Sequence, residues 1–194
     1  MAVQDQLRLA TGGLMSRIGQ RVWSWGIHPD TITIVGTLLA GVASLFIVSG
    51  HLQVAGVILI VALPLDALDG AVARAMNQPN RRFGGVLDST LDRYADGLLV
   101  GSLIFYFQSA GQPVFAMACL FTLIGSFTTS YVRSRAALAG YEVKGGLMDR
   151  LVRVIILLVG LMIPVSLALI AVILAVTTNI TTLQRLIIAK QHLE

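Results

Sequence analysis

Charged residues are scarce in this sequence. Asp, Glu, Lys and Arg make up 12% of its 194 residues, about half of their share in soluble domains. Hydrophobic residues make up 56%, and the mean hydropathy is +0.81. This composition excludes an ordinary soluble domain and indicates an all-α integral membrane protein. We expect membrane lipids around the chain and no nucleic-acid partner.

Cysteine is almost absent as well. Cys119 is the one cysteine and lies within an apolar run, which excludes a disulfide framework and favours a packed thiol. Residues 1–30 lack the continuous apolar core and the small-residue cleavage site of a secretory signal peptide.

Six apolar segments follow residue 30, each close to the ~20 residues needed to cross a bilayer. They span roughly 31–50, 53–75, 85–108, 112–139, 147–163 and 165–189. The turns between them place all 14 Lys and Arg residues on the side of the membrane that holds both termini. By the positive-inside rule this side is cytoplasmic. We therefore expect six transmembrane helices in the plasma or inner membrane, with the chemistry on the cytoplasmic side.

An amphipathic segment precedes these six. On a helical wheel the apolar face of residues 14–25 consists of Leu14, Met15, Ile18, Val22 and Trp25. We expect an N-terminal interfacial amphipathic helix within residues 1–30 and one membrane domain at 31–190. A soluble helix packed on the membrane domain is the alternative for the N-terminal region.

Four carboxylates lie at the ends of two apolar segments. Asp66 and Asp69 are three residues apart, and Asp88 and Asp92 are four apart, so on helices each pair projects from one face. Burying four such charges at membrane depth costs about 10 kcal/mol. Divalent cations bound by carboxylate oxygens compensate that cost, and pairing with arginines is the structural alternative.

These residues belong to a longer pattern. Asp66-x-x-Asp69-Gly70-x-x-Ala73-Arg74, followed by Gly84-x-x-x-Asp88-x-x-x-Asp92, resembles the signature of the CDP-alcohol phosphatidyltransferases. The pattern fixes eight residue identities over 27 positions, whereas an isolated Asp-x-x-Asp would be uninformative. Nine residues separate Arg74 from Gly84, one more than in the family. This leaves open whether Asn80 or Arg81 contacts the phosphates of the nucleotide.

The resemblance implies a site for CDP-diacylglycerol and two Mg²⁺ ions, with Mn²⁺ as a possible substitute, in a homodimer. The metal ligands it implies are Asp66, Asp69, Asp88 and Asp92. It makes Asp92 the catalytic general base, which accepts the proton of the acceptor hydroxyl. The residues implied to bind the nucleotide and its lipid are Asp30, Thr33, Asp69, Gly70, Ala73, Arg74, Arg81 and Gly84.

Basic residues from the last three apolar segments are similar to the acceptor-phosphate pocket of one branch, the phosphatidylinositol-phosphate synthases. They are Arg133, Arg135, Arg153 and Arg185, together with the polar residue Ser130. Arg153 and Arg185 lie within apolar runs, where a charge is costly without an anionic partner. The branch implies inositol 1-phosphate as the acceptor. Arginines placed only by the positive-inside rule are the alternative, and Asp96 is expected to pair with a nearby arginine.

Other functions fit the sequence less well. Intramembrane carboxylates also mark ion transporters, but all charges here lie on one side. A membrane prenyltransferase has Asp-rich metal sites, but its spacing would not supply Gly70, Arg74 and Gly84 in register. Within the family, glycerol 3-phosphate is the alternative acceptor, as in phosphatidylglycerophosphate synthases.

Overall fold

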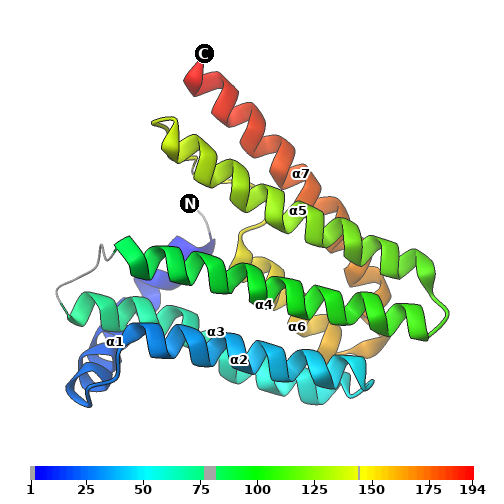
Figure 1. Ribbon diagram of the computed structural model, residues 1–194, viewed down its shortest axis with the longest axis horizontal. Coiled ribbons are helices and arrows are strands. Elements are labelled where there is room, and N and C mark those ends of the chain that lie inside the picture. Colours follow the sequence, from blue (N-terminus) through cyan, green and yellow to red (C-terminus); the bar gives the residue numbers. More distant parts are fainter. Residues whose placement is uncertain (1–2, 77–81, 144) are drawn as a thin grey trace.

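Every element of the structure is a helix. Figure 1 shows the computed structural model, which describes residues 3–76, 82–143 and 145–194. The helices are α1 (Val3–Ser24), α2 (Pro29–Val48), α3 (Leu52–Ala75), α4 (Arg82–Ser109), α5 (Pro113–Leu138), α6 (Arg150–Met162), the short 3₁₀ helix η1 (Pro164–Ser166) and α7 (Leu167–Leu193). Pro29 and Pro113 open α2 and α5, where a missing N–H costs nothing.

Four helical segments of the described chain are long and apolar enough to cross a membrane. They are Pro29–Val48, Leu52–Ala75, Pro113–Leu138 and Pro164–Leu193. Their outer faces leave large apolar side chains such as Leu38, Leu45 and Val57 exposed. Such faces are unfavourable in water and favourable in lipid, so the all-helical, multi-pass membrane architecture predicted from composition is confirmed.

The fifth predicted segment, 147–163, is shorter in the structure than expected. Helix α6 has 13 residues and is therefore about 20 Å long, shorter than the ~30 Å core of a bilayer. It begins only at Arg150 because the backbone of Asp149 is extended, with φ −81° and ψ 162°. Gly145 and Gly146, with φ angles of +106° and +117°, belong to the non-helical segment before it.

The N-terminal helix is longer than predicted. Helix α1 begins at Val3 rather than near residue 14. Gly19 packs so closely on α3 that a Cβ atom there would lie 2.7 Å from the carbonyl carbon of Ala71. Val22 is buried in the same contact, whereas Leu14 and Ile18 are exposed. The predicted apolar face is thus divided between packing on α3 and an exposed strip.

Helices α5 and α7 form a close pair that extends away from the other helices (Figure 1). Gly125 of α5 lies directly against Thr178 of α7, where a side chain would collide. Hydroxyl groups join the helices beside it, since Thr129 Oγ1 and Thr182 Oγ1 are 2.7 Å apart. Small residues and interhelical hydrogen bonds are the usual contacts between helices in lipid.

The antiparallel order of the helices brings the polar residues together. Helices α2, α4 and α6 begin, and α3, α5 and α7 end, at the same end of the molecule. The turns at the other end, residues 49–51, 110–112 and 163–166, contain no Asp, Glu, Lys or Arg. The candidate site residues that the structure describes therefore lie at one end of the bundle.

Candidate active site

Three of the four predicted metal ligands form a cluster. Oxygen atoms of Asp66 on α3 and of Asp88 and Asp92 on α4 lie within 4.8 Å of one another. Asp88 and Asp92 are one helical turn apart and project toward α3. This is a donor set of carboxylate oxygens, which hard divalent cations such as Mg²⁺ and Mn²⁺ prefer. The residues present fit a divalent cation.

Asp69 is directed elsewhere. Its side chain is buried, and its Oδ2 atom accepts a 2.7 Å hydrogen bond from the hydroxyl of Thr33 on α2. Its Oδ1 atom accepts a bond from the backbone N–H of Gly70. Three residues along a helix rotate a side chain by about 60° relative to Asp66, which turns Asp69 toward α2. The structure therefore joins two residues predicted to serve the nucleotide, Thr33 and Asp69.

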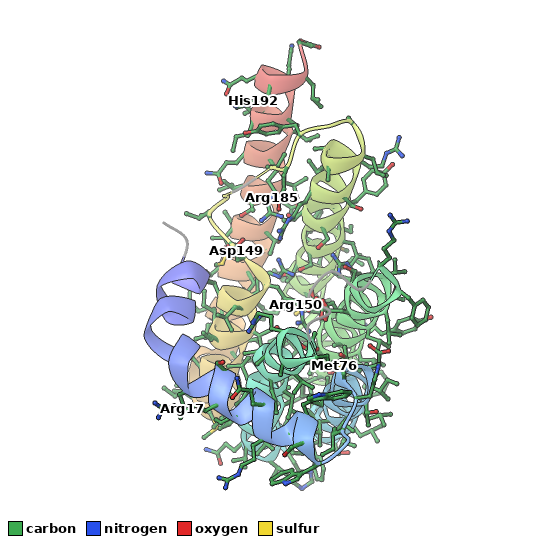
Figure 2. The ribbon with its side chains drawn as sticks, turned by 90° about the vertical axis from the view of Figure 1, so that its left-hand side faces the viewer. Arg17, Met76, Asp149, Arg150, Arg185 and His192 are labelled. Carbon is green, nitrogen blue, oxygen red and sulfur yellow. The ribbon has the colours of Figure 1, made fainter. Side chains whose placement is uncertain are left out.

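Arg150 bridges two carboxylates of the cluster, and Figure 2 shows it among the helices in the middle of the molecule. Its Nη1 atom is 2.6 Å from Asp66 Oδ1 and 2.7 Å from Asp92 Oδ1. Its Nε atom is buried, has no hydrogen-bond partner among the described residues, and lies 3.5 Å from Asp96 Oδ1. The sequence places Arg150 among the basic residues at this end of the chain's helices, but it is not one of the predicted site residues. A signal existed, because Arg150 precedes Arg153 by three residues and shares its helix face.

Arg153 and Asp96 form a buried ion pair. Nη2 of Arg153 donates a 2.8 Å hydrogen bond to Oδ2 of Asp96, and the two side chains are 8% and 11% exposed. This confirms the prediction that Asp96 pairs with a nearby arginine. Because Asp96 also faces Arg150, a continuous network of charges runs from α6 through α4 to Asp66 of α3.

Arg185 holds the segment that precedes α6. It is 5% exposed, and its guanidinium donates to the Gly145 carbonyl at 3.0 Å, the Thr129 carbonyl at 3.2 Å and Asp149 Oδ1 at 3.0 Å. Asp149 directly precedes α6. Figure 2 shows Asp149 and Arg185 close together beside α7. The guanidinium therefore links three separate parts of the fold.

Further bonds attach this segment to α7. The backbone N–H of Met148 donates to Thr181 Oγ1 at 3.0 Å, and that of Leu147 donates to Gln184 Oε1 at 3.0 Å. A Cβ atom at Gly146 would lie 2.7 Å from Thr181 Cγ2. The segment 145–149, which we call the α6 approach, is thus fixed by α7. It determines where α6 begins and therefore where Arg150 and Arg153 lie.

The other predicted acceptor residues lie near the end of α5. Ser130 is half-buried, and Arg133 and Arg135 are exposed. Arg133 is 3.6 Å from Glu142, and its charge lies close enough to Arg185 to interact with it.

The predicted nucleotide residues lie on α2, α3 and the start of α4. Described among them are Asp30, Thr33, Asp69, Gly70, Ala73, Arg74 and Gly84. Asp30 is 3.4 Å from His28 Nδ1. A Cβ atom at Gly70 would lie 3.4 Å from Nη1 of Arg74, so glycine keeps that guanidinium close to the helix. Asn80 and Arg81 lie outside the described residues.

A small cavity of about 60 Å³ adjoins the cluster between α2, α3, α4 and α6. One part of its wall is polar, with Thr33, Asp66, Asp92 and Arg150, and the other part is apolar, with Leu59, Leu63, Leu99 and Val154 among others. An amphipathic ligand suits such a wall.

The chain is similar to known proteins of one family. A family model for CDP-alcohol phosphatidyltransferases matches residues 26–184. An archaetidylinositol phosphate synthase of Pyrococcus horikoshii is 38% identical over 181 residues, which are 93% of each chain. The solved structure of phosphatidylinositol phosphate synthase from Mycobacterium tuberculosis with CDP-DAG bound has a TM-score of 0.82 and 31% identity, covering 90% of this chain and 92% of that one. A structure of that protein in complex with manganese and citrate also has a TM-score of 0.82 and 31% identity, covering 91% of this chain and 88% of that one.

The chain belongs to the CDP-alcohol phosphatidyltransferase family. It is a membrane-bound transferase of phospholipid biosynthesis, and the resemblance read from its Asp-rich pattern is confirmed.

Proposed function

We propose that the protein transfers the phosphatidyl group of CDP-diacylglycerol to a hydroxyl of inositol 1-phosphate, giving phosphatidylinositol phosphate and CMP. The observation that carries the proposal is the charge network at one end of the bundle, in which Asp66 and Asp92 adjoin Asp96 and Arg153 through Arg150. A metal-binding carboxylate cluster and a basic pocket next to it suit a pyrophosphate donor and a phosphorylated acceptor. The names of the relatives support the same acceptor class.

The carboxylates would hold the metal ions. Asp66, Asp88 and Asp92 supply the clustered oxygens, and Asp69 is the fourth ligand of the proposed set of two Mg²⁺ ions. Mn²⁺ can replace Mg²⁺ because both accept carboxylate oxygens. When bound, such ions neutralise negative charge on the pyrophosphate and polarise the phosphoryl group.

Asp92 is the proposed general base. It lies one turn beyond Asp88 on α4, in the half-buried part of the cluster and beside Arg150. Its carboxylate takes the proton of the acceptor hydroxyl while the hydroxyl oxygen bonds to the lipid phosphorus. The bond from that phosphorus to the CMP oxygen breaks in the same displacement, and no covalent enzyme intermediate forms.

The nucleotide is proposed to lie along α2 and α3. Gly70 and Ala73 carry almost no side chain, which lets a ligand approach the backbone of α3. Arg74 can donate two parallel hydrogen bonds to phosphate oxygens. Asp30, Thr33, Arg81 and Gly84 complete the proposed set.

The acceptor phosphate is proposed to bind Arg133, Arg153 and Arg185, with Ser130 and Arg135 at the edge. A phosphomonoester carries nearly two negative charges at neutral pH and accepts several charge-assisted hydrogen bonds. The charges of Arg133 and Arg153 both act on Arg185, and a dianion relieves that repulsion. An unphosphorylated alcohol would gain nothing from three arginines.

We propose a topology of six crossings, in which α4 and the stretch 147–166, where α6 is extended by the residues before it and by η1, cross the membrane together with the four long apolar segments. Helix α1 lies in the interface, where Arg17 points away from the bundle (Figure 2). The region 1–30 serves as the interfacial part and 31–190 as one membrane domain. The active site and both termini face the cytoplasm, and two copies form a homodimer.

The test is an acceptor panel. Purified protein is incubated with CDP-diacylglycerol, or with its archaeal ether analogue, Mg²⁺ and one acceptor at a time, and the lipid product is identified by mass spectrometry. We expect product with inositol 1-phosphate and none with free inositol or serine. If glycerol 3-phosphate alone were turned over, the proposed phosphate pocket would stand, because the same arginines suit that phosphate. The proposed acceptor, inositol 1-phosphate, would then be wrong. Equal turnover of free inositol or serine would refute the pocket.

A further inference from the structure

We propose that Arg150 is a built-in counter-ion that exchanges with the divalent cation. Its guanidinium neutralises Asp66 and Asp92 when no metal is bound and moves to Asp96 when a metal takes these two carboxylates. The inference rests on the proposed metal site and concerns the residue that competes for it.

The contacts of Arg150 are those of a cation in the metal position. One atom, Nη1, lies within 2.7 Å of oxygens from two different helices, Asp66 on α3 and Asp92 on α4. The same two residues belong to the cluster whose oxygens lie within 4.8 Å of one another. A guanidinium and a divalent ion cannot both lie between these oxygens, because the attraction that holds either of them repels the other.

Asp96 supplies the second position. Its Oδ2 atom is already bound by Arg153, whereas its Oδ1 atom lies 3.5 Å from the buried Nε of Arg150. That Nε has no hydrogen-bond partner among the described residues. A small rotation of the side chain can bring Nε and Oδ1 into a hydrogen bond. Exchange therefore keeps the guanidinium paired in both states, and Asp96 becomes the shared partner of Arg150 and Arg153.

The exchange has a measurable consequence for metal affinity. In the wild type the metal must displace two short charge-assisted contacts of Arg150, and only one new contact with Asp96 replaces them. Arg150→Gln removes the competitor and should lower the Kd for Mn²⁺ about tenfold, or about 1.4 kcal/mol. A merely structural role predicts the opposite, because a disturbed cluster binds metal more weakly.

The control is Arg93→Gln. Arg93 Nη1 lies 3.8 Å from Asp92 Oδ2, and its side chain is half-exposed. This variant removes the same charge near the same carboxylate without vacating the space between Asp66 and Asp92. Because solvent screens an exposed pair, we expect its Kd for Mn²⁺ to change less than about threefold.

The experiment measures Mn²⁺ binding to detergent-purified wild type, Arg150→Gln and Arg93→Gln by calorimetry or electron paramagnetic resonance, in the absence of lipid substrate. Tighter binding to Arg150→Gln alone supports the exchange. Equal or weaker binding to Arg150→Gln overturns it while the metal site stands. If the wild type binds no Mn²⁺ at all, the proposed metal site fails and the exchange fails with it.

A second measurement does not depend on any variant. Experimental structures of the wild-type protein are determined in chelator and in Mn²⁺. The separation of Arg150 Nη1 from Asp66 Oδ1 should increase from a hydrogen-bond distance to more than about 4 Å in Mn²⁺, with Arg150 then bound to Asp96. An Arg150 that keeps both original contacts beside a bound Mn²⁺ ion would overturn the exchange.

Discussion

Replacing Arg185 by Gln should destabilise the protein far more than replacing an exposed arginine. The guanidinium of Arg185 is 5% exposed and donates to the Gly145 carbonyl, the Thr129 carbonyl and Asp149. Removing one partner of a buried ion pair costs about 3–5 kcal/mol, because the other charge stays buried and unpaired. Here the group left unpaired is Asp149, directly before α6, whose side chain is mostly buried at 19% exposed.

This cost converts into a change in melting temperature. In a chain of 150–250 residues each kcal/mol shifts Tm by about 2–4 °C, so Arg185→Gln should lower Tm by about 6–20 °C. The matched control is Arg133→Gln, because Arg133 is exposed and lies 3.6 Å from Glu142. Exposed pairs contribute at most about 1 kcal/mol, so the control should lower Tm by less than about 4 °C.

The assay is thermal unfolding of both variants in the same detergent, without substrate. A double-mutant cycle with Asp149→Asn separates the ion pair from the two carbonyl contacts. If the ion pair carries most of the effect, the Tm of the double variant should fall by much less than the sum of the decreases in the two single variants. A Tm for Arg185→Gln no lower than that of Arg133→Gln would refute the conclusion that Arg185 holds the α6 approach in place.

Three further predictions concern catalysis, metal and packing. Asp92→Asn should reduce kcat by about 10²–10⁴-fold while CDP-lipid binding persists; turnover within tenfold of wild type would exclude Asp92 as the base. Excess chelator should reduce activity to background, and added Mg²⁺ or Mn²⁺ should restore it; activity that persists in chelator would contradict the metal requirement. Gly125→Val should lower Tm, because the added carbons meet Thr178 across the α5–α7 contact; Gly101→Val is the control, since a Cβ atom at Gly101 meets nothing within 4 Å.

The sequence was sufficient to predict the helical class and the place of the site. Hydropathy indicated the apolar segments, and the alternation of antiparallel helices placed Asp66 and Asp92 at the same end. The spacing of Asp88 and Asp92 gave their common face directly, because one helical turn is a local property. The pairing of Asp96 with an arginine also followed from the sequence, because a buried charge needs an opposite one.

The sequence could not predict the contacts that depend on how helices rotate against one another. The direction of Asp69 toward Thr33 follows from the packing of α3 on α2, which local spacing does not specify. Arg150 looked like any basic residue at a cytoplasmic helix end, and its central position appears only when α6 packs between α3 and α7. The shortness of α6 depends on the extended backbone at Asp149, which apolar composition does not reveal.

The attachment of the α6 approach to α7 has a consequence for biosynthesis. A ribosome makes the chain from the N-terminus, so the carboxylates of α3 and α4 are complete well before Thr181, Gln184 and Arg185 emerge. Until then Leu147 and Met148 lack the partners that hold them. The newly inserted protein therefore holds its carboxylate cluster before the α6 approach is attached. Helix α7, which follows along the chain, then supplies the contacts that fix this approach.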